Sequence, residues 1–351
     1  MRGESAMKRP SPVVYAGVIA CFAAVLAIGK WGPVGAFVDA VRAQSAAPPG
    51  MAAPVFAPAE EPCDRVAREA PGQRIEPVNA KIDPVWKAIP GYDGREADVD
   101  ATCERIRSME KNTVLKAEIP WVYRPVHPDV GLDDLPPAPV YRGNPAKPAA
   151  ALMINVAWGN EHIPGMLEAL REEKVKATFF FDGSWLRKNT DLARQIASDG
   201  HELSNHAYSH PNMSELTRQQ ASEEIAKTEK LLEETFGVRN RWFAPPSGDY
   251  SQETVQIAYE HGLKTVLWTL DTVDWKRPSP DWIVRRVTDR LEPGALILMH
   301  PTEPTRIALP TLIREIKRRG FALGTVSDTL SMDRLDTETA GDGGGKTDDK
   351  M

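Results

Sequence analysis

The 351-residue sequence has only three cysteines, one long apolar run and no block of basic residues after its first ten positions. Phosphate backbones are bound by concentrated lysine and arginine, so intermixed charges with a net value of −6 argue against a nucleic-acid partner. No glycine-rich phosphate loop follows the first apolar strand-like segment of the C-terminal half, which argues against a dinucleotide-binding fold. No pair of cysteines has zinc-ribbon spacing.

The one long apolar run covers residues 13–30 and follows a basic segment, residues 1–12. Its length is near the lower limit of the ~17–25 residues needed to cross a bilayer. Because basic flanks stay in the cytoplasm, we expect a transmembrane signal anchor with the bulk of the chain outside the membrane. Two alternatives stay open, namely secretion after signal cleavage within 40–47 and a lipoprotein attached through Cys21.

Two segments have compositions that cannot form a packed core. Residues 43–62 are rich in alanine and proline and are expected to form an extended linker. Residues 331–351 contain a glycine run among aspartate, threonine and lysine, and we predict a disordered tail there. The folded part of the chain is therefore expected between these two segments.

Residues 63–147 are predicted to form a small α+β domain, to which the sequence assigns no role. A helix is expected over 97–111 and a strand over 113–119. The same region holds Cys63 and Cys103. Outside the cytoplasm these two cysteines are free to form a disulfide, and a pair of free thiols is the alternative.

From 148 to 330 the sequence alternates short apolar runs with amphipathic stretches. A helix capped by Thr217 and Gln220 is predicted to end at Gly237. Alternating strands and helices imply a parallel sheet, and about seven repeats favour an irregular (β/α) barrel. The strands are expected at 150–157, 175–181, 201–205, 241–244, 263–270, 296–299 and 321–326.

Unusual polar residues follow or end several of these predicted strands. Barrel enzymes place their sites at the carboxyl ends of the strands, so these side chains are expected to gather at one face. The residues are Asn155, His206, His210, Asp271 and His300.

His206 and His210 are four residues apart. If the segment forms one helical turn, both imidazoles face the same way and can share a metal ion. Glutamate does not follow His206, so the zinc-protease motif is absent. We therefore predict a two-histidine metal site of another kind.

These motifs, in this order, resemble those of the polysaccharide deacetylases, the NodB-homology or carbohydrate esterase family 4 domain. The family's H-S/T-x-x-H motif corresponds to 206–210, its D-x-x-D-W motif to 271–275 and its L-x-H motif to 298–300. Residues 176–180, K-A-T-F-F, match its second strand. The resemblance covers about 148–328 and implies a barrel that hydrolyses the acetamide of an N-acetylated glycan with a divalent metal, zinc by preference.

Two motifs depart from the family pattern. Counting back from Pro164, the family's paired aspartates, one a base and one a metal ligand, fall on Asn155 and Val156. The arginine that pairs with the base falls on Ala244. Since an arginine left beside Asn155 would be a buried charge without a partner, the losses look coordinated. Asn155 has no useful basicity and Val156 has no ligand atom, so the resemblance implies weak zinc affinity and low activity.

The remaining motif residues keep the roles that the resemblance implies. His300 is expected to act as the general acid, and Asp271 is expected to hold its tautomer by a hydrogen bond. Substrate contacts are expected from Trp275, Leu298, Pro245 and Pro246. Trp158 and Tyr250 are further candidates for the wall of a sugar groove.

A substitute carboxylate would rescue metal binding or base catalysis. The sequence offers three acids near the predicted face, Glu161, Asp249 and Glu303. Each also fits a helix start or an exposed surface position, so none is assigned.

Three functions are left open by the sequence. The first is slow N-deacetylation of peptidoglycan or spore-cortex glycan, and the second is a catalytically silent glycan-binding or scaffolding protein of the cell envelope. The third is hydrolysis of another amide with an unrecognised base. The phrase at 155–160, N-V-A-W-G-N, looks most like a sporulation-associated subgroup of the family. The expected partners are the glycan and, through the anchor, the membrane.

Overall fold

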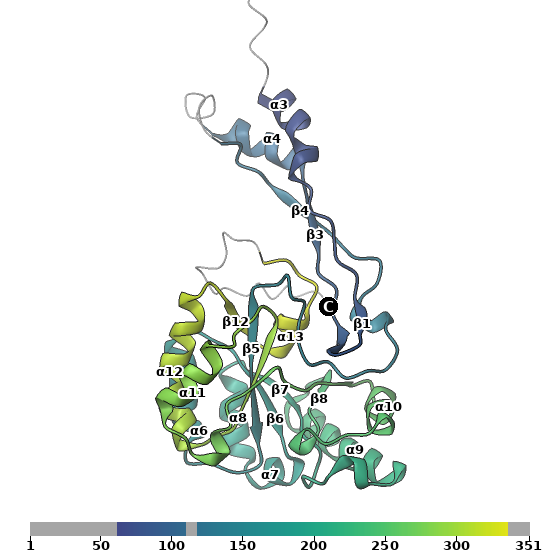
Figure 1. Cartoon of the computed structure of the whole chain (residues 1–351), viewed down its shortest axis with the longest axis vertical. Helices are drawn as coiled ribbons and strands as arrows, with labels where there is room; N and C mark the ends of the chain where they lie inside the picture. Colours follow the sequence, from purple (N-terminus) through teal and green to yellow (C-terminus); the bar gives the residue numbers. More distant parts are fainter. Residues whose placement is uncertain (1–61, 110–117, 336–351) are drawn as a thin grey trace, which may run out of the picture. The chain divides into compact units, whose positions relative to one another are not determined.

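A computed structural model describes residues 62–109 and 118–335 (Figure 1). The predicted anchor at 13–30 and nearly all of the linker at 43–62 lie outside the described residues. So do most of the strand expected at 113–119 and of the C-terminal tail. Within the described residues, no helix has the length and apolar character needed to span a bilayer.

The centre of the fold is a parallel sheet, as the alternating pattern predicts. Along the sheet the order is β10-β11-β5-β6-β7-β8-β9, and β12 pairs with the beginning of β5. Every pairing is parallel, so each strand must be joined to the next by a crossover segment. The strands are β5 (Ala149–Val156), β6 (Thr178–Phe181), β7 (Glu202–Asn205), β8 (Trp242–Phe243), β9 (Lys264–Thr265), β10 (Leu270–Asp271), β11 (Ala295–Met299) and β12 (Ala322–Gly324).

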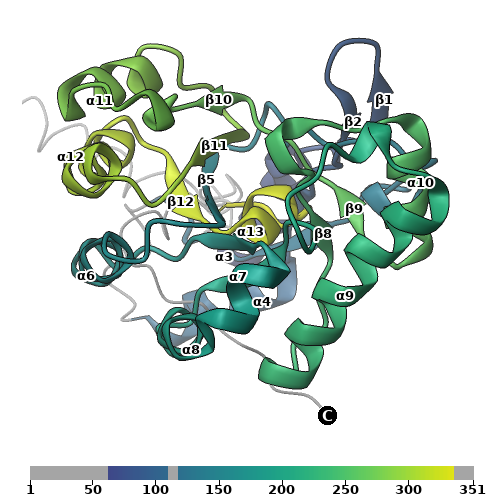
Figure 2. The ribbon, with the colours of Figure 1, turned by 90° about the horizontal axis from the view of Figure 1, so that it is seen from below.

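Helices surround these strands, as the view from below shows (Figure 2). The predicted capping box forms at Thr217 and Gln220, and left-handed Gly237 ends the helix that they open. Ser251 and Ser279 cap two further helices, each by accepting a backbone N–H three residues on. The helices are α6 (Ile163–Glu172), α7 (Gly183–Lys188), α8 (Thr190–Ser198), α9 (Arg218–Phe236), α10 (Gln252–Glu260), α11 (Pro280–Thr288), α12 (Glu303–Arg318) and α13 (Val326–Leu330).

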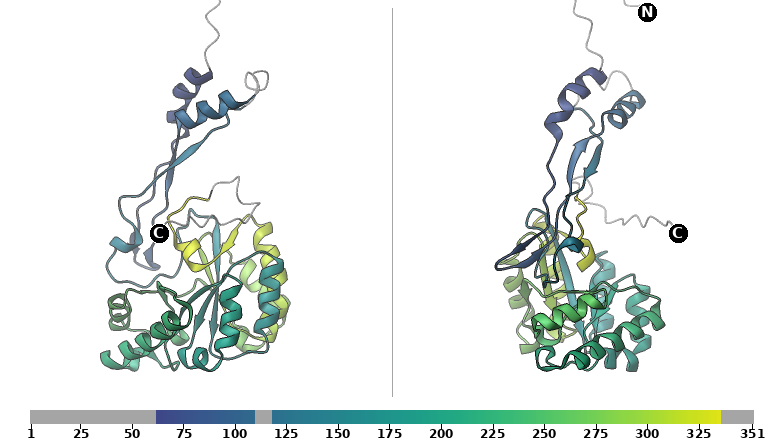
Figure 3. Two further views of the ribbon diagram at one scale, coloured as in Figure 1. Left: turned by 180° about the vertical axis from the view of Figure 1, so that it is seen from behind. Right: turned by 90° about the vertical axis from the view of Figure 1, so that its right-hand side faces the viewer.

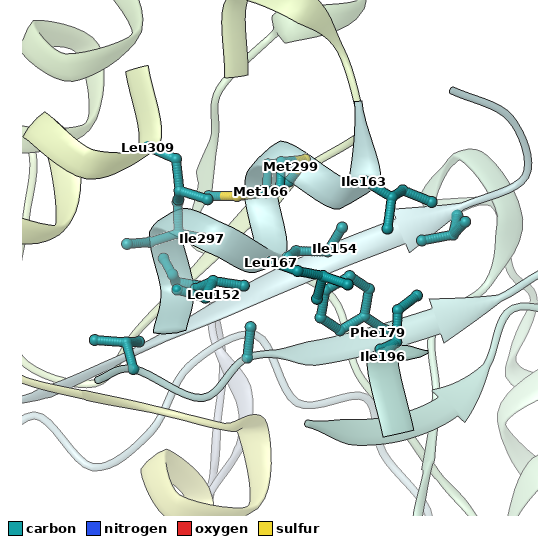
Figure 4. Packing of buried hydrophobic residues seen from close by; sticks show 14 of the residues in the cluster. Leu152, Ile154, Ile163, Met166, Leu167, Phe179, Ile196, Ile297, Met299 and Leu309 are labelled. Atoms are coloured by element: carbon teal, nitrogen blue, oxygen red, sulfur yellow. The ribbon is translucent and has the colours of Figure 1, made fainter. Parts of the chain in front are cut away.

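Strand β5 is buried along its whole length, and its side chains alternate between two apolar clusters. Its even-numbered residues pack outward against α6 and α12, among Met166, Leu167, Ile297 and Leu309 (Figure 4). Ala151 and Met153, which are odd-numbered, pack inward in the other cluster. This alternation fixes the orientation of the strand's last residues, since a shift of one residue would turn a side chain from the outer cluster to the inner one.

The strand expected at 263–270 is divided in two. Val140 lies beside the break: its N–H donates to Thr265 O at 2.9 Å, and its carbonyl accepts from Leu267 N–H at 2.8 Å. Thr269 N–H then donates to Leu296 O at 2.9 Å. The first part of the divided strand, β9, therefore pairs with β8, and the second part, β10, pairs with β11. A residue more than a hundred positions upstream therefore completes the sheet, which local sequence does not reveal.

The segment before the sheet contains two antiparallel strand pairs, β1–β2 and β3–β4, and two helices. The helix expected over 97–111 forms with shorter bounds, because Asp98 caps it by accepting the Ala101 N–H. Figure 3 shows this segment in purple and blue from two sides. Whether 63–147 is a separate domain stays a prediction. The elements are α3 (Pro62–Glu69), β1 (Lys81–Asp83), β2 (Lys87–Ile89), β3 (Gly94–Ala97), α4 (Val99–Ser108) and β4 (Tyr123–Val126).

Cys63 and Cys103 form a disulfide that joins α3 to α4, with Cα atoms 5.5 Å apart. Around it lies a small apolar cluster that includes Val66 and Ile106. The cluster is far smaller than the one beneath the sheet. We infer that the bond contributes much of the stability of this helix pair.

Replacing both cysteines by serine should loosen α3 and leave the sheet intact. The bond closes a loop of 40 residues, for which chain entropy predicts about 4 kcal/mol. Limited proteolysis should then cut within 62–109 while the main thermal transition moves little. Equal protease resistance of the oxidised parent and the double variant would contradict this expectation.

Candidate functional site

A cavity of about 430 Å³ opens at the carboxyl ends of β5, β7, β10 and β11. That volume is within the range of small-molecule sites. The sequence motifs therefore converge on one place, as predicted from their positions after successive strands. The lining residues are Asn155, Ala157, Trp158, His206, His210, Ser247, Trp268, Asp271, Trp275, Leu298 and His300.

The two histidines of the predicted metal pair face each other. Their ring centroids are 5.2 Å apart and their planes are inclined by 75°. The condition of a helical turn between them is not met: the segment is a loop in which Ala207 and His210 have φ of 60° and 59°. Neighbouring elements hold this loop in place. Asn205 and Glu224 accept its N–H groups, and the carbonyl of Ala207 accepts from Gly183 N–H and Thr228 Oγ1.

His206 is set up to present one nitrogen to the cavity. Its Nδ1–H donates to the carbonyl oxygen of Ala244 at 2.7 Å, which leaves Nε2 as the acceptor. Burial, with a smaller contribution from His210, lowers the pKa of His206 to about 3. The ring is therefore neutral at physiological pH, the form that binds metal ions.

His300 is held by a different aspartate from the one predicted. The expected partner was Asp271, but Asp274 makes the bond: its Oδ1 accepts from His300 Nδ1 at 2.8 Å. The other oxygen of Asp274 accepts His300 N–H and the Thr305 hydroxyl, each at 2.6 Å. Asp274 is fully buried, so these donors replace its lost hydration.

A strained turn explains why the second aspartate of the motif points inward. Val273 has φ of 53°, an unfavourable value for a β-branched residue. Its N–H donates to Asp271 Oδ1 at 2.7 Å. The turn sends Asp274 into the interior and leaves Asp271 and Trp275 on the cavity wall. Sequence spacing alone does not distinguish the two aspartates.

Asn155 occupies the predicted base position and faces the cavity. It is only 4% exposed, and its Oδ1 has no hydrogen-bond partner among the described residues. The interior below it is apolar, because Met153 and Ala244 belong to one cluster. The side chain of Ala244, where the family pattern has an arginine, carries no charge. A carboxylate at residue 155 would therefore lack that cationic partner.

The position assigned to the third metal ligand needs correction. Val156 belongs to the outer apolar cluster and does not line the cavity, because it is the last residue of the alternating strand. The next residue, Ala157, lines the cavity instead. Neither side chain carries a ligand atom, so the chemical conclusion is unchanged.

The described residues do not complete a catalytic zinc site. They contain no group of three or more histidine, cysteine, aspartate or glutamate side chains placed to hold a metal ion. Glu161 pairs with His162, Asp249 accepts from Ser214, and Glu303 lies in the exposed first turn of α12. None of these three acids lines the cavity.

Asp182 is a buried acid near the site that the sequence did not single out. It follows β6 and caps α7 by accepting from Ser184 Oγ at 2.6 Å and Trp185 N–H at 2.8 Å. Burial raises the pKa of its carboxyl. These two bonds hold it at the start of the helix, and it does not line the cavity.

The predicted substrate contacts are only partly placed at the cavity. Trp275 and Leu298 line it, whereas Pro245 and Pro246 are buried and do not. Ser247, which follows the two prolines with φ of 55°, takes their place. Trp268 also lines the cavity, and sequence missed it because it lies in the break between β9 and β10.

The family model for polysaccharide deacetylases matches residues 142–266. A Bacillus subtilis protein of unassigned function, YlxY, is 46% identical over 272 residues, which are 78% of this chain and 84% of that protein. A peptidoglycan-N-acetylglucosamine deacetylase of Bacillus cereus is 34% identical over 171 residues. Those residues are 47% of this chain and 62% of the deacetylase.

Solved structures give the same grouping. A carbohydrate esterase family 4 pseudoenzyme of Bacillus anthracis superposes with a TM-score of 0.72 at 40% identity. The match covers 78% of this chain and 96% of the pseudoenzyme. A mutant of that protein with restored enzymatic activity has a TM-score of 0.71 at 39% identity, covering 78% of this chain and 99% of the mutant.

The two aspartates of one motif should differ sharply in their effect on stability. Asp274→Ala leaves three donors around a fully buried position without their acceptor, and we expect it to lower the free energy of unfolding by about 3–5 kcal/mol. Asp271→Ala removes one bond at the cavity wall and should cost less than about 1 kcal/mol. Urea denaturation of both variants measures the difference. Equal losses would contradict the assignment of Asp274 as the buried anchor.

Proposed function

Because this chain belongs to the polysaccharide deacetylase family, we propose that it binds an N-acetylated cell-wall glycan in the cavity and hydrolyses its acetamide slowly at best. One observation carries the proposal. Asn155, with an unpartnered amide oxygen, occupies the base position beside His206, His210 and His300. The recognition half of the site is retained and the charge needed for proton abstraction is missing.

The relatives support this separation of glycan binding from catalysis. The Bacillus cereus relative is a deacetylase of peptidoglycan N-acetylglucosamine, and the Bacillus anthracis structure is that of a pseudoenzyme. A mutant of the pseudoenzyme has restored enzymatic activity. This supports the view that such a site lacks only a few catalytic side chains. Peptidoglycan or spore-cortex glycan is therefore the proposed ligand, and an association with sporulation stays a prediction.

A divalent ion, zinc by preference, would be held by His206 and His210. Bound there, the ion would polarise the acetyl carbonyl and activate water. Catalytic zinc sites use three protein ligands, so the affinity of a two-histidine site should be low. His300, oriented by Asp274, is placed to hold a proton for the leaving amine.

The second candidate is a catalytically silent glycan-binding protein. The lack of a third metal-ligating side chain among the described residues favours it. The two candidates differ in one measurable property, the release of acetate. They share the cavity and its glycan.

We also propose that the protein works outside the cytoplasmic membrane. Disulfides persist in oxidising compartments and are rare in the cytosol, and the Cys63–Cys103 bond supports this location. A cell-wall ligand is found in the same place. The anchor predicted at 13–30 would tether the protein there.

Substituting Asn155→Asp should recover metal binding and activity together. The new carboxylate would place a negative charge beside the two histidines, and this charge should attract zinc and tighten its binding about tenfold or more. Acetate release from N-acetylated peptidoglycan should rise by about 10²–10⁴, the usual worth of a positioned base. Zinc should also raise the melting temperature of the variant more than that of the parent, since the ion neutralises a buried anion.

Asn79→Asp is the matched control, because it adds the same charge at an exposed loop residue that does not line the cavity, and its Oδ1 already accepts from Val130 N–H. It should change neither zinc affinity nor acetate release. Parent protein that releases acetate at the rate of the Asn155→Asp variant would refute the assignment of residue 155. Failure of the parent to bind any N-acetylated glycan would refute the proposed ligand.

A further inference from the structure

Trp158 lies on the cavity wall with an open ring face. Its indole is nearly parallel to the imidazole of His300, with an angle of 8° between the planes and 6.0 Å between the centroids. The residue is nevertheless 47% exposed, whereas most large apolar side chains of this chain are buried. A large exposed aromatic surface beside a cavity calls for an explanation by binding.

The turn that carries Trp158 is fastened on both sides. Gly159 has φ of 84°, and a Cβ there would lie 2.0 Å from the carbonyl oxygen of Pro301. Only glycine permits this close approach to the residue after His300. On the other side Asn160 accepts from Trp185 Nε1 at 2.7 Å and donates to Asn189 at 2.6 Å. The backbone turn that carries the indole is therefore held in place by contacts of its own.

Trp275 provides a second exposed aromatic surface at the same cavity and is 54% exposed. The Lys276 ammonium lies 4.8 Å from the centroid of its ring, which restricts how the indole turns. Trp268 and Leu298 add apolar wall between the polar groups. The C–H faces of a pyranose ring are apolar, and flat aromatic side chains match them in shape.

The His300–Asp274 pair has a second use in this arrangement. Asp274 fixes the imidazole by a bond to the ring and a bond to the backbone, and the fixed imidazole supports the indole of Trp158. A binding site needs this support even when it needs no acid. The indole of Trp158 therefore has a fixed neighbour without any contribution from a metal ion.

We propose that Trp158 is a sugar-binding residue, which packs its indole on a pyranose ring of the N-acetylated glycan and, with Trp275, holds that ring over Asn155. The inference rests on the proposed function, since it names the wall that recognises the same ligand. It assigns glycan affinity to aromatic surface, so affinity is independent of the missing base. His300 acts in it as a positioning residue for the indole.

The test is the affinity of purified full-length protein for chitotetraose, measured by calorimetry without added zinc. Trp158→Ala should weaken binding about tenfold or more, as truncation of a central aromatic contact does. Trp158→Phe keeps a flat ring and should restore most of the affinity. Trp282→Ala is the matched control, because Trp282 is an exposed tryptophan on α11 that does not line the cavity. It should leave the affinity unchanged.

The results separate this inference from the proposed function. Unchanged affinity in Trp158→Ala, with a loss in Trp275→Ala, would overturn the role of Trp158 and leave the glycan site standing. Equal losses in the alanine and phenylalanine variants would also overturn it, since ring stacking would then not be the cause. No binding of chitotetraose or of N-acetylated peptidoglycan fragments by the parent would overturn both. Matching melting temperatures of parent and variants exclude unfolding as the cause of a loss.

Discussion

A buried charge needs a partner, and this constraint shapes the whole site. Asp274 is fully buried and accepts bonds from the His300 ring, the His300 backbone and the Thr305 hydroxyl. Those donors stabilise its negative charge and thereby fix His300 at the cavity. At residue 155 the described residues offer no comparable partner, because Ala244 and Met153 form an apolar interior below it. A neutral amide is the side chain that this interior accommodates without a counter-ion. The need for a partner thus accounts both for the carboxylate at Asp274 and for the amide at Asn155.

The neutral site changes what the cavity is suited to do. Burial keeps His206 uncharged, and Asn155 adds a polar atom without charge. Around these groups stand three tryptophans and Leu298. A neutral glycan needs shape and apolar contact more than charge, so the proposed recognition does not depend on the base. Rapid hydrolysis does depend on it, because proton abstraction from water requires a group with proton affinity. The same cavity can therefore be a competent binding site and a poor catalyst.

Much of the fold was predictable from sequence because its signals are local. Apolar runs of strand length, the capping box at Thr217 and the glycine at 237 placed the strands and helices of the sheet domain to within a few residues. The break between β9 and β10 was not predictable, because Val140 supplies the hydrogen bonds from far away in sequence. In the site, motif spacing correctly predicted which strands contribute residues but not which side chains face the cavity. Strand alternation turned Val156 outward, a strained φ at Val273 turned Asp274 inward, and distant glutamate contacts shaped the loop of His206 and His210.

The most direct test of the account is a crystal structure of the parent protein soaked with chitotetraose and zinc. We predict a pyranose ring in the cavity between Trp158 and Trp275, with its acetyl group intact above Asn155 and with little or no zinc on His206 and His210. A fully occupied zinc ion with three protein ligands, beside a sugar that has lost its acetyl group, would contradict the account.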